Sequence, residues 1–438
     1  MRTVWCEAEL NTIGRYRTYK SYKTHEASTL ILKTKTLLLS FLTLLCVGVC
    51  VGLSEALPQN NAEPSSTTVA LHVEFNRPFI DLQFTRSDGS PRTARFWVDT
   101  GGGGFLFCET LARDIGLKIG EELRAEGERL APTKPPVTML GRMAIDVEGA
   151  RAFVMLGKKT INPGVDAEGL FPAHLLRRYH VIFDYPGRKF TLAKPGTVKP
   201  SGVRLETPID QHSGFPRVEL QIEGQTYGLL LDTGASFTMI SREQLEAWLK
   251  VKPELPNAIG ALGAGDMGLG KMEADALMLG LAPIDLGPFK LNGVAAVSRP
   301  KGTFEQYMSR MMAKPIIGAL GGNVLRAFRI EIDYANNATY FEKSGSLDTD
   351  LVTSGLTLVA REDGSYTVSG VAKQNDRPLI EGVLPGDKLI KIDKLDVAGA
   401  RLATVIDALR GKSGTQHTLV LEREGKELII KAPVLKIM

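Results

Sequence analysis

Asp-Thr-Gly occurs twice in the sequence, each time at the end of an apolar run. Asp99-Thr100-Gly101 follows Phe96-Trp97-Val98, and Asp232-Thr233-Gly234 follows Leu229-Leu230-Leu231. A single Asp-Thr-Gly is most simply a turn, because Asp and Thr bond to the local backbone and Gly adopts conformations that other residues avoid. Two copies allow a chemical role if the fold brings the two carboxyl groups together.

Two carboxyl groups within hydrogen-bonding reach can hydrolyse a bond by general acid–base catalysis. They cannot both ionise cheaply, so one keeps its proton. A water molecule between Asp99 and Asp232 could then lose a proton to the ionised carboxylate while the protonated carboxyl polarises a carbonyl. This chemistry needs no metal, nucleophilic serine or cofactor. Gly101 and Gly234 allow a tight turn that exposes each carboxylate.

The segments around the two motifs indicate a duplicated unit. FIDLQF (79–84) and RVELQI (217–222) both alternate apolar and polar residues, which predicts half-buried strands that each lead into an Asp-Thr-Gly. Residues 169–185 and 318–334 also match at a constant offset of 149, whereas the motifs are 133 apart. We interpret 69–196 and 197–346 as two related β-rich lobes. A pseudo-twofold axis between them would bring Asp99 and Asp232 together.

At these residues the chain resembles the pepsin and retropepsin families of aspartic peptidases, over roughly residues 69–346. The resemblance implies a mostly β, bilobal fold of two retropepsin-like, double-psi β-barrel lobes, with peptide or protein substrates. It implies that Asp99 and Asp232 are the catalytic pair and that Thr100 and Thr233 brace the two turns. A hydrophobic-hydrophobic-Gly segment packs behind each turn in this family, and Ala319-Leu320-Gly321 fits it. The second motif, which runs on through Ala235 and Ser236, is the closer match, and Gly101, Gly234 and Ser236 complete the predicted peptidase site.

The first motif departs from the family pattern. Gly102-Gly103-Gly104 stands where Ala-Ser and one residue fewer are expected, and Pro172 stands opposite Gly321. Glycine reduces the rigidity that holds a catalytic carboxylate in place. Two alternatives to a single-chain peptidase therefore stay open: a catalytically impaired protein that only binds peptides, and an enzyme active only as a homodimer through its second lobes. The glycine-rich stretch 260–270 is either a flap over the site or a surface loop.

Other catalytic patterns are incomplete. Residues 263–268 have the spacing of a dinucleotide-binding turn without a preceding hydrophobic strand, and 265–271 form a phosphate loop that Met272 breaks. The histidines form no H-E-x-x-H pair, there is no G-x-S-x-G elbow, and His174 and His180 are expected to be packing or surface residues. We therefore predict no metal and no cofactor.

The C-terminal residues 354–438 resemble a bacterial PDZ domain, an α+β fold, after a small polar linker at 344–353. The most specific part is the run Leu384–Asp393, LPGDKLIKID. PDZ domains bind peptide C-termini by adding them to a sheet as a strand. The resemblance implies that backbone amides near Gly355, Leu356, Thr357 and Leu358 hold the carboxylate. Alternatively, the domain only packs on the peptidase.

The N-terminal region predicts export. Residues 36–54 carry no charge and follow Lys33 and Lys35, so 1–56 is a signal peptide or a retained membrane anchor, with a linker at 57–68. The protein would lie in the periplasm or cell envelope, be secreted, or be tethered outside the cytoplasm through 36–54. The net charge of +4 is matched by the excess positive charge of residues 1–35 alone, so we expect no nucleic-acid partner. We expect a monomer.

Overall fold

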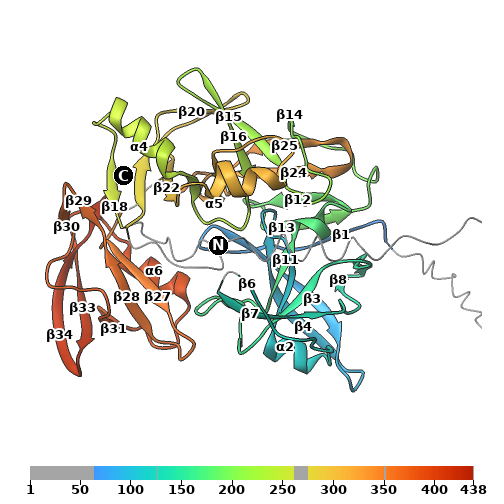
Figure 1. The fold of residues 1–438 in the computed structure, drawn as a ribbon, viewed down its shortest axis with the longest axis horizontal. Helices are drawn as coiled ribbons and strands as arrows, with labels where there is room; N and C mark the ends of the chain where they lie inside the picture. The colour runs from blue at the N-terminus through green and yellow to red at the C-terminus, as the bar shows by residue number, and fades with distance from the viewer. Residues whose placement is uncertain (1–63, 126, 261–274, 350–351, 438) are drawn as a thin grey trace, which may run out of the picture. The chain divides into compact units, whose positions relative to one another are not determined.

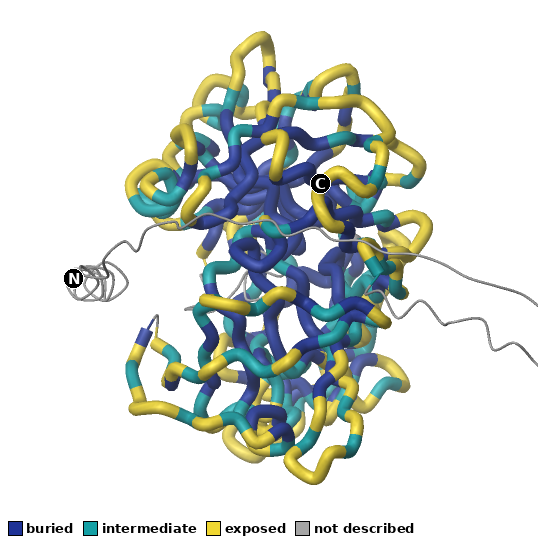
Figure 2. Tube along the Cα trace, turned by 90° about the vertical axis from the view of Figure 1, so that its right-hand side faces the viewer, coloured by how far each residue is buried: buried dark blue, intermediate teal, exposed yellow. Residues whose placement is uncertain are grey.

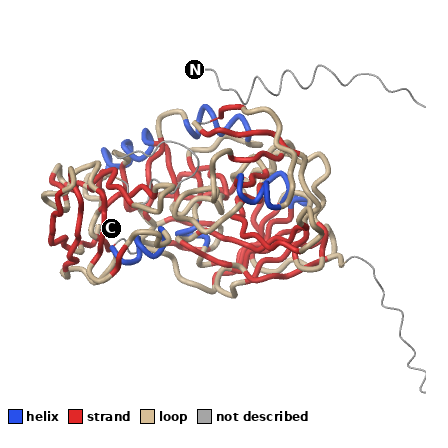
Figure 3. Tube along the Cα trace, turned by 90° about the horizontal axis from the view of Figure 1, so that it is seen from below, coloured by secondary structure: helices blue, strands red, loops and turns tan. Residues whose placement is uncertain are grey.

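The computed structural model describes residues 64–125, 127–260, 275–349 and 352–437 (Figure 1). These residues are mostly β-strand, as the sequence predicts, with short helices between the strands (Figure 3). They belong to one compact body, Glu63–Met438. The predicted leader 1–56, most of the glycine-rich stretch 260–270 and both nucleotide-binding patterns lie outside the described residues. In the described ranges, no helix has the length and apolar character that a membrane crossing requires.

The first sheet carries the first Asp-Thr-Gly at the end of one of its strands. Ile80, Leu82 and Phe84 are buried while Gln83 is exposed, so the alternation predicted for 79–84 is present. In sheet order the described strands are β6 (Leu123–Ala125), β7 (Glu128–Thr133), β10 (Ala152–Met155), β5 (Phe105–Cys108), β11 (Gly169–Pro172), β4 (Pro91–Asp99), β3 (Arg77–Thr85), β8 (Met139–Leu140) and β9 (Met143–Ala144), with β2 (His72–Glu74) beside β3.

The second sheet carries the second Asp-Thr-Gly and also includes two strands from the C-terminal region. In sheet order the described strands are β21 (Phe289–Leu291), β20 (Ile284–Leu286), β15 (Arg217–Ile222), β16 (Gln225–Leu231), β23 (Gly318–Leu320), β17 (Thr238–Ser241), β22 (Ala295–Arg299), β19 (Leu277–Gly280), β18 (Asn257–Ile259), β29 (Lys373–Gln374) and β30 (Arg377–Pro378).

The two sheets share one order of pairing around the motifs. In the first, β4 pairs parallel with β11, β11 antiparallel with β5, and β5 parallel with β10. In the second, β16, β23, β17 and β22 repeat these relations. In both sheets, the first residue of the next strand, Phe105 or Thr238, comes six positions after the Asp. The expectation that the first turn carries one extra residue is therefore wrong.

A short helix follows the strand after each turn. Helix α2 (Glu109–Asp114) follows β5, and helix α4 (Arg242–Val251) follows β17. The Ser241 hydroxyl caps α4 by accepting a hydrogen bond from the Gln244 amide. The remaining short helices of the body are α3 (Ala173–Leu176), α5 (Gly322–Leu325), η3 (Thr303–Tyr307), η4 (Met308–Met311) and η5 (Tyr334–Asn336).

A third sheet joins the two related segments, 69–196 and 197–346, which we call the first and second repeats. Its central strands, β12 (His180–Asp184) and β24 (Phe328–Asp333), pair antiparallel, with His180 opposite Asp333. The order among described strands is β1 (Ser66–Ala70), β13 (Lys189–Ala193), β12, β24, β25 (Ala338–Lys343) and β14 (Val203–Glu206). We call it the bridging sheet, because each half of it comes mainly from one repeat.

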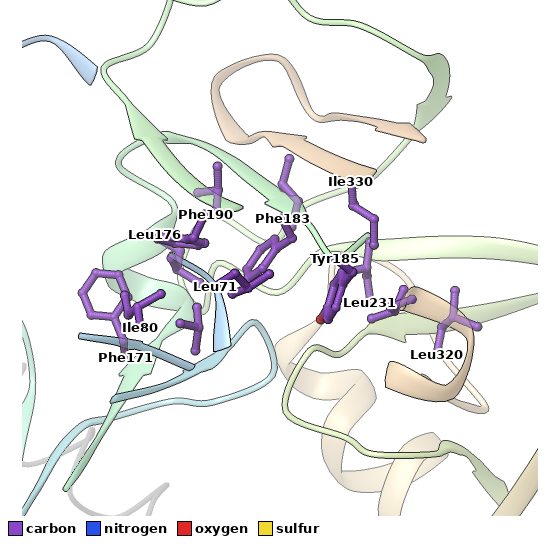
Figure 4. Packing of buried hydrophobic residues seen from close by; sticks show 14 of the residues in the cluster. Leu71, Ile80, Phe171, Leu176, Phe183, Tyr185, Phe190, Leu231, Leu320 and Ile330 are labelled. Atoms are coloured by element: carbon purple, nitrogen blue, oxygen red, sulfur yellow. The ribbon is translucent and has the colours of Figure 1, made fainter. Parts of the chain in front are cut away.

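One apolar cluster lies under all three sheets, and the buried residues concentrate in the interior of the trace (Figure 2). Figure 4 shows Leu231 and Leu320 of the second sheet near Tyr185 and Ile330 of the bridging sheet. Phe171 of the first sheet belongs to the same cluster. Because core side chains are close-packed, this shared core fixes the strands that end at the two motifs.

The C-terminal unit, residues 352–437, has a sheet and an apolar core of its own. Its largest buried side chain is Tyr366, which packs with Val368, Leu389 and Val405. The described elements are β27 (Leu356–Ala360), β28 (Tyr366–Val371), β31 (Lys388–Ile392), β33 (Gln416–Arg423) and β34 (Lys426–Pro433) in sheet order, β32 (Leu395–Asp396) beside β31, the pair β26 (Val352–Thr353) and β35 (Leu435–Lys436), and helix α6 (Leu402–Leu409).

Candidate active site

The two Asp-Thr-Gly turns interlock through their threonines. The Thr100 amide donates to the Thr233 hydroxyl at 3.1 Å, and the Thr233 amide donates to the Thr100 hydroxyl at 3.0 Å. Each hydroxyl in turn donates across the junction, Thr100 to the Leu231 carbonyl at 2.6 Å and Thr233 to the Val98 carbonyl at 2.8 Å. Both threonines are fully buried. The four bonds are equivalent under exchange of the two halves and bring both turns of one chain together.

The carboxyl groups of Asp99 and Asp232 meet above this interlock and share a hydrogen bond. The Gly101 amide donates to Asp99 and the Gly234 amide donates to Asp232, both at 2.8 Å. A Cβ atom on Gly234 would lie 2.4 Å from an Asp99 carboxylate oxygen, and one on Gly101 would lie 2.9 Å from the Asp232 carboxyl carbon. Glycine is therefore required at both positions for the carboxyl groups to approach.

The electrostatic setting distinguishes the two carboxyls. Burial raises the pKa of Asp232 well above its usual range, and the negative charge of Asp99 raises it further. Burial also raises the pKa of Asp99, but the Gly101 amide, the hydrogen bond with Asp232 and the positive charge of Arg77 oppose that rise. The pKa of Asp232 is thus raised more strongly than that of Asp99, which favours a proton on Asp232.

Arg77 is a site residue that the sequence pattern does not reveal. It is 2% exposed, and its Nε donates to the Gly234 carbonyl at 3.1 Å. Its guanidinium lies over the Trp97 ring, 4.4 Å from the ring centroid. Arg77 thus connects the first repeat to the second turn and places a buried positive charge beside Asp99. The only sequence signal is a charged residue at the start of the predicted strand, ahead of the alternation at 79–84.

The two residues before Arg77 also contact the segment after Asp232. The Asn76 amide nitrogen donates to the Ser236 carbonyl at 3.2 Å, and the Phe75 ring packs edge-on against Phe237 with centroids 5.7 Å apart. The segment Phe75–Arg77 therefore supports the second turn from the first repeat. Ser236, a predicted site residue, is fully buried, and its hydroxyl has no hydrogen-bond partner within the described residues.

The segments behind the two turns differ. Gly321 lies where a Cβ would be 2.2 Å from the Phe237 carbonyl oxygen, and the Asp232 amide donates to the Leu320 carbonyl at 3.1 Å. In the first repeat, Pro172 lies directly opposite Asp99 in the parallel pair β4–β11. The predicted hydrophobic-hydrophobic-Gly segment thus backs the second turn, and proline takes the corresponding place in the first.

The two histidines considered from sequence are both buried. His174 is 6% exposed, and neither ring nitrogen makes a hydrogen bond of normal geometry within the described part of the chain. Burial, aided by the charges of Arg151, Arg178 and Arg177, lowers the pKa of His174 to about 4. His180 bonds Glu331 at 2.6 Å in the bridging sheet.

The predicted carboxylate-binding residues of the C-terminal unit are buried. Gly355, Leu356, Thr357 and Leu358 all lie away from solvent. The Thr357 hydroxyl donates to the Gly260 carbonyl of the second repeat. These four residues take no part in the contacts of Asp99 and Asp232 given above.

Comparison with known families finds the aspartyl protease family, whose model matches residues 218–324. No curated protein matches the chain. The matched segment contains Asp232-Thr233-Gly234 and Gly321 but does not include Asp99. This match supports a retropepsin-like aspartic peptidase domain in the second repeat.

Proposed function

We propose that this protein is an aspartic endopeptidase in which Asp99 and Asp232 of one chain activate a water molecule to hydrolyse peptide bonds. The observation that carries the proposal is the reciprocal Thr100–Thr233 interlock, with the two carboxyl groups hydrogen-bonded above it. The aspartyl protease match over 218–324 supports the same chemistry for the second half.

The charges of the pair suit each step of the reaction. Ionised Asp99 takes a proton from water as the water oxygen bonds to the peptide carbonyl carbon, while Asp232 gives its proton to the carbonyl oxygen. In the second step the proton on Asp99 passes to the leaving nitrogen, and Asp232 recovers its own as the carbonyl re-forms and the C–N bond breaks. Each carboxyl ends in the state in which it began.

Two alternatives remain distinct hypotheses. In the first, the protein binds peptides without cleaving them, because the glycines at 102–104 do not hold Asp99 firmly enough for catalysis. In the second, the active enzyme is a homodimer that pairs the second repeats of two chains. The interlock within one chain favours the single-chain pair over the homodimer. The charge of Arg77 beside Asp99 favours a working base over an inert carboxyl.

We further propose that the C-terminal unit is PDZ-like and that the protein is exported. The sheet and helix α6 support a PDZ-like unit, which would take peptide C-termini at Gly355–Leu358. Burial of those residues favours a partner within the chain over a free peptide end. Export to the periplasm, cell envelope or medium, with or without a tether at 36–54, rests on the uncharged segment in the sequence.

The test is cleavage of a peptide library by the purified chain lacking residues 1–56, with and without pepstatin. We expect cleavage in acid that pepstatin blocks and EDTA leaves unchanged, since the described residues contain no group of three or more His, Cys, Asp or Glu side chains that could hold a metal ion. Binding of library peptides without any cleavage would instead support the peptide-binding alternative. Loss of cleavage in EDTA, restored by zinc, would contradict the proposed chemistry.

A further inference from the structure

The C-terminal unit is attached to the second repeat through sheet, core and side-chain contacts. Strand β29 pairs with β18, with Lys373 opposite Ile259, so the second sheet continues into the C-terminal unit. Ala372 and Ile437 lie in one buried cluster with Phe237, the fifth residue after Asp232. With the Thr357 bond to Gly260, these contacts fix the unit to the repeat that carries Asp232.

The same unit contacts the first repeat through the loop after β10. The Leu402 amide, at the start of α6, donates to the Gly164 carbonyl at 2.8 Å. A Cβ on Gly164 would lie 2.9 Å from the Ala360 Cβ and 3.1 Å from the Leu402 Cβ, so the loop fits closely between β27 and α6. Lys158 forms an ion pair with Glu362 at 3.0 Å.

Gly164 lies next to the strand edge at which a PDZ-like unit would bind a peptide. Strand β27 lies at the edge of its described sheet, so one side of the strand has no neighbouring strand there. A strand edge flanked by a helix binds extended peptide by strand addition. Gly164 lies at the Ala360 end of this groove, while Thr357, at the other end, contacts Gly260. Segments of the body therefore lie at both ends of the groove.

We propose that the loop Lys158–Val165 is a built-in ligand of the β27–α6 groove, and that the C-terminal unit thereby braces the Asp99 repeat against the Asp232 repeat. Each repeat supplies one carboxyl, and catalysis requires both to stay within a fraction of an ångström of their working positions. A unit bonded to both repeats opposes their separation. Only the consequence for cleavage rests on the proposed peptidase function.

The test compares two glycines of the same loop region. Gly164→Ala adds a methyl group against Ala360 and Leu402 at a φ of +77°, whereas Gly157→Ala adds it at a φ of +79° with nothing within 4 Å. Both glycines have nearly the same φ in the left-handed region, so Gly157→Ala is the matched control. Ala360→Leu crowds the contact from the other side without any change in the first repeat.

Hydrogen exchange of the full chain gives a readout that does not depend on activity. For Gly164→Ala and Ala360→Leu we expect the Leu402 amide to exchange roughly tenfold faster than in Gly157→Ala, because its bond to Gly164 opens locally. Peptide cleavage should fall in the same two variants.

The outcomes separate this proposal from the proposed function. Leu402 exchange in both variants equal to that of the Gly157→Ala control would overturn the built-in ligand. Faster Leu402 exchange with unchanged cleavage would overturn the brace. If the unaltered chain cleaves no peptide, the peptidase proposal fails, and Leu402 exchange still decides whether the loop is bound.

Discussion

The turn at Asp99 and the turn at Asp232 have the same backbone plan but are held in different ways. Behind the second, Asn323 is 1% exposed, accepts hydrogen bonds from the Thr238 amide and hydroxyl at 2.7 and 2.9 Å, and donates to the Ala295 carbonyl at 2.9 Å. The equivalent residue behind the first turn, at the offset of 149, is His174, which has no such bonds.

This difference indicates that the Asp99 turn has less support from its own repeat than the Asp232 turn has. Its own sequence, Gly102-Gly103-Gly104, has no side chains, while the second turn has Ala235, Ser236 and Phe237. The interlock and Arg77 act across the junction and hold the two turns together. The aspartyl protease match, confined to 218–324, falls on the turn that is supported within its own repeat.

Among the variants that keep both carboxyl groups, the largest expected effect comes from closing the space between the turns. Gly234→Ala should lower kcat/KM by about 100-fold or more, because the new methyl group would lie on the Asp99 carboxylate and displace it. Gly101→Ala would place its methyl group against the Asp232 carboxyl and should lower kcat/KM to a similar extent. Gly103→Ala is the control, since a Cβ there meets nothing within 4 Å and should leave kcat/KM unchanged. Equal activity in all three variants would contradict the close approach of the carboxyls.

Where the central strands of the bridging sheet meet, the first repeat contributes His180 and the second contributes its buried partner Glu331. Hydrogen bonds from His180 and from Arg329 overcome the effect of burial and lower the pKa of Glu331 to about 2. A carboxyl with a lowered pKa stabilises the fold above its unfolded pKa, and that stability is lost as the pH falls from about 4.5 to about 2.

Glu331→Gln should therefore lower the unfolding free energy by up to about 3 kcal/mol at pH 7, and by much less near pH 2. Denaturant titrations at both pH values measure this. Glu342→Gln on the neighbouring strand β25, where the side chain is exposed, is the control and should change little. A loss that is the same at both pH values would show that the charge of Glu331 is not the cause.

Arg77 gives a smaller effect with a specific pH signature. Arg77→Met should cost about 2 kcal/mol of stability, because it removes a buried charged hydrogen bond to Gly234. It should also raise the pKa of Asp99, so the acidic limb of the kcat/KM profile should move to higher pH. Arg77→Lys keeps the charge and should keep the limb closer to its original position. A Met variant that loses stability but keeps the acidic limb would limit Arg77 to a structural role.

The smallest expected effect is a gain in stability. Gly103 has a φ outside the left-handed region and open space at its Cβ position. Gly103→Ala should therefore raise the unfolding free energy by about 0.5 kcal/mol, since alanine restricts the unfolded chain. Thermal unfolding measures this directly. A destabilised variant would show that the first turn needs its glycine at this position.

Sequence reasoning predicted the features that depend on local pattern. The alternation at 79–84 and 217–222 predicts strands β3 and β15, and the duplicated unit predicts that the two motifs occupy equivalent strand ends. It missed the contacts made between segments far apart in sequence. Nothing near Arg77 or Asn76 indicates that they support residues 234–236.

The predicted tether of the C-terminal unit shows the same limit. A small polar linker at 344–353 suggests an independent unit, but β29 extends the second sheet and Gly355–Leu358 are buried. Packing between units depends on complementary surfaces that no periodicity records. The prediction of an extra residue in the first turn was wrong for a similar reason, because only strand pairing fixes where the turn ends.

The central claim is that the two carboxyls of one chain act together, and separate Asp99→Asn and Asp232→Asn variants test it most directly. Each should lower kcat/KM for peptide cleavage at least about 1,000-fold, because an amide can neither take the proton of water nor restore the charge of the pair. Each should stay a monomer and unfold at the same or a higher temperature at neutral pH, since burial raises the pKa of both carboxyls and disfavours their ionised forms. Near-normal cleavage by Asp99→Asn beside an inactive Asp232→Asn would contradict the claim, because the active pair would then come from the second repeats of two chains.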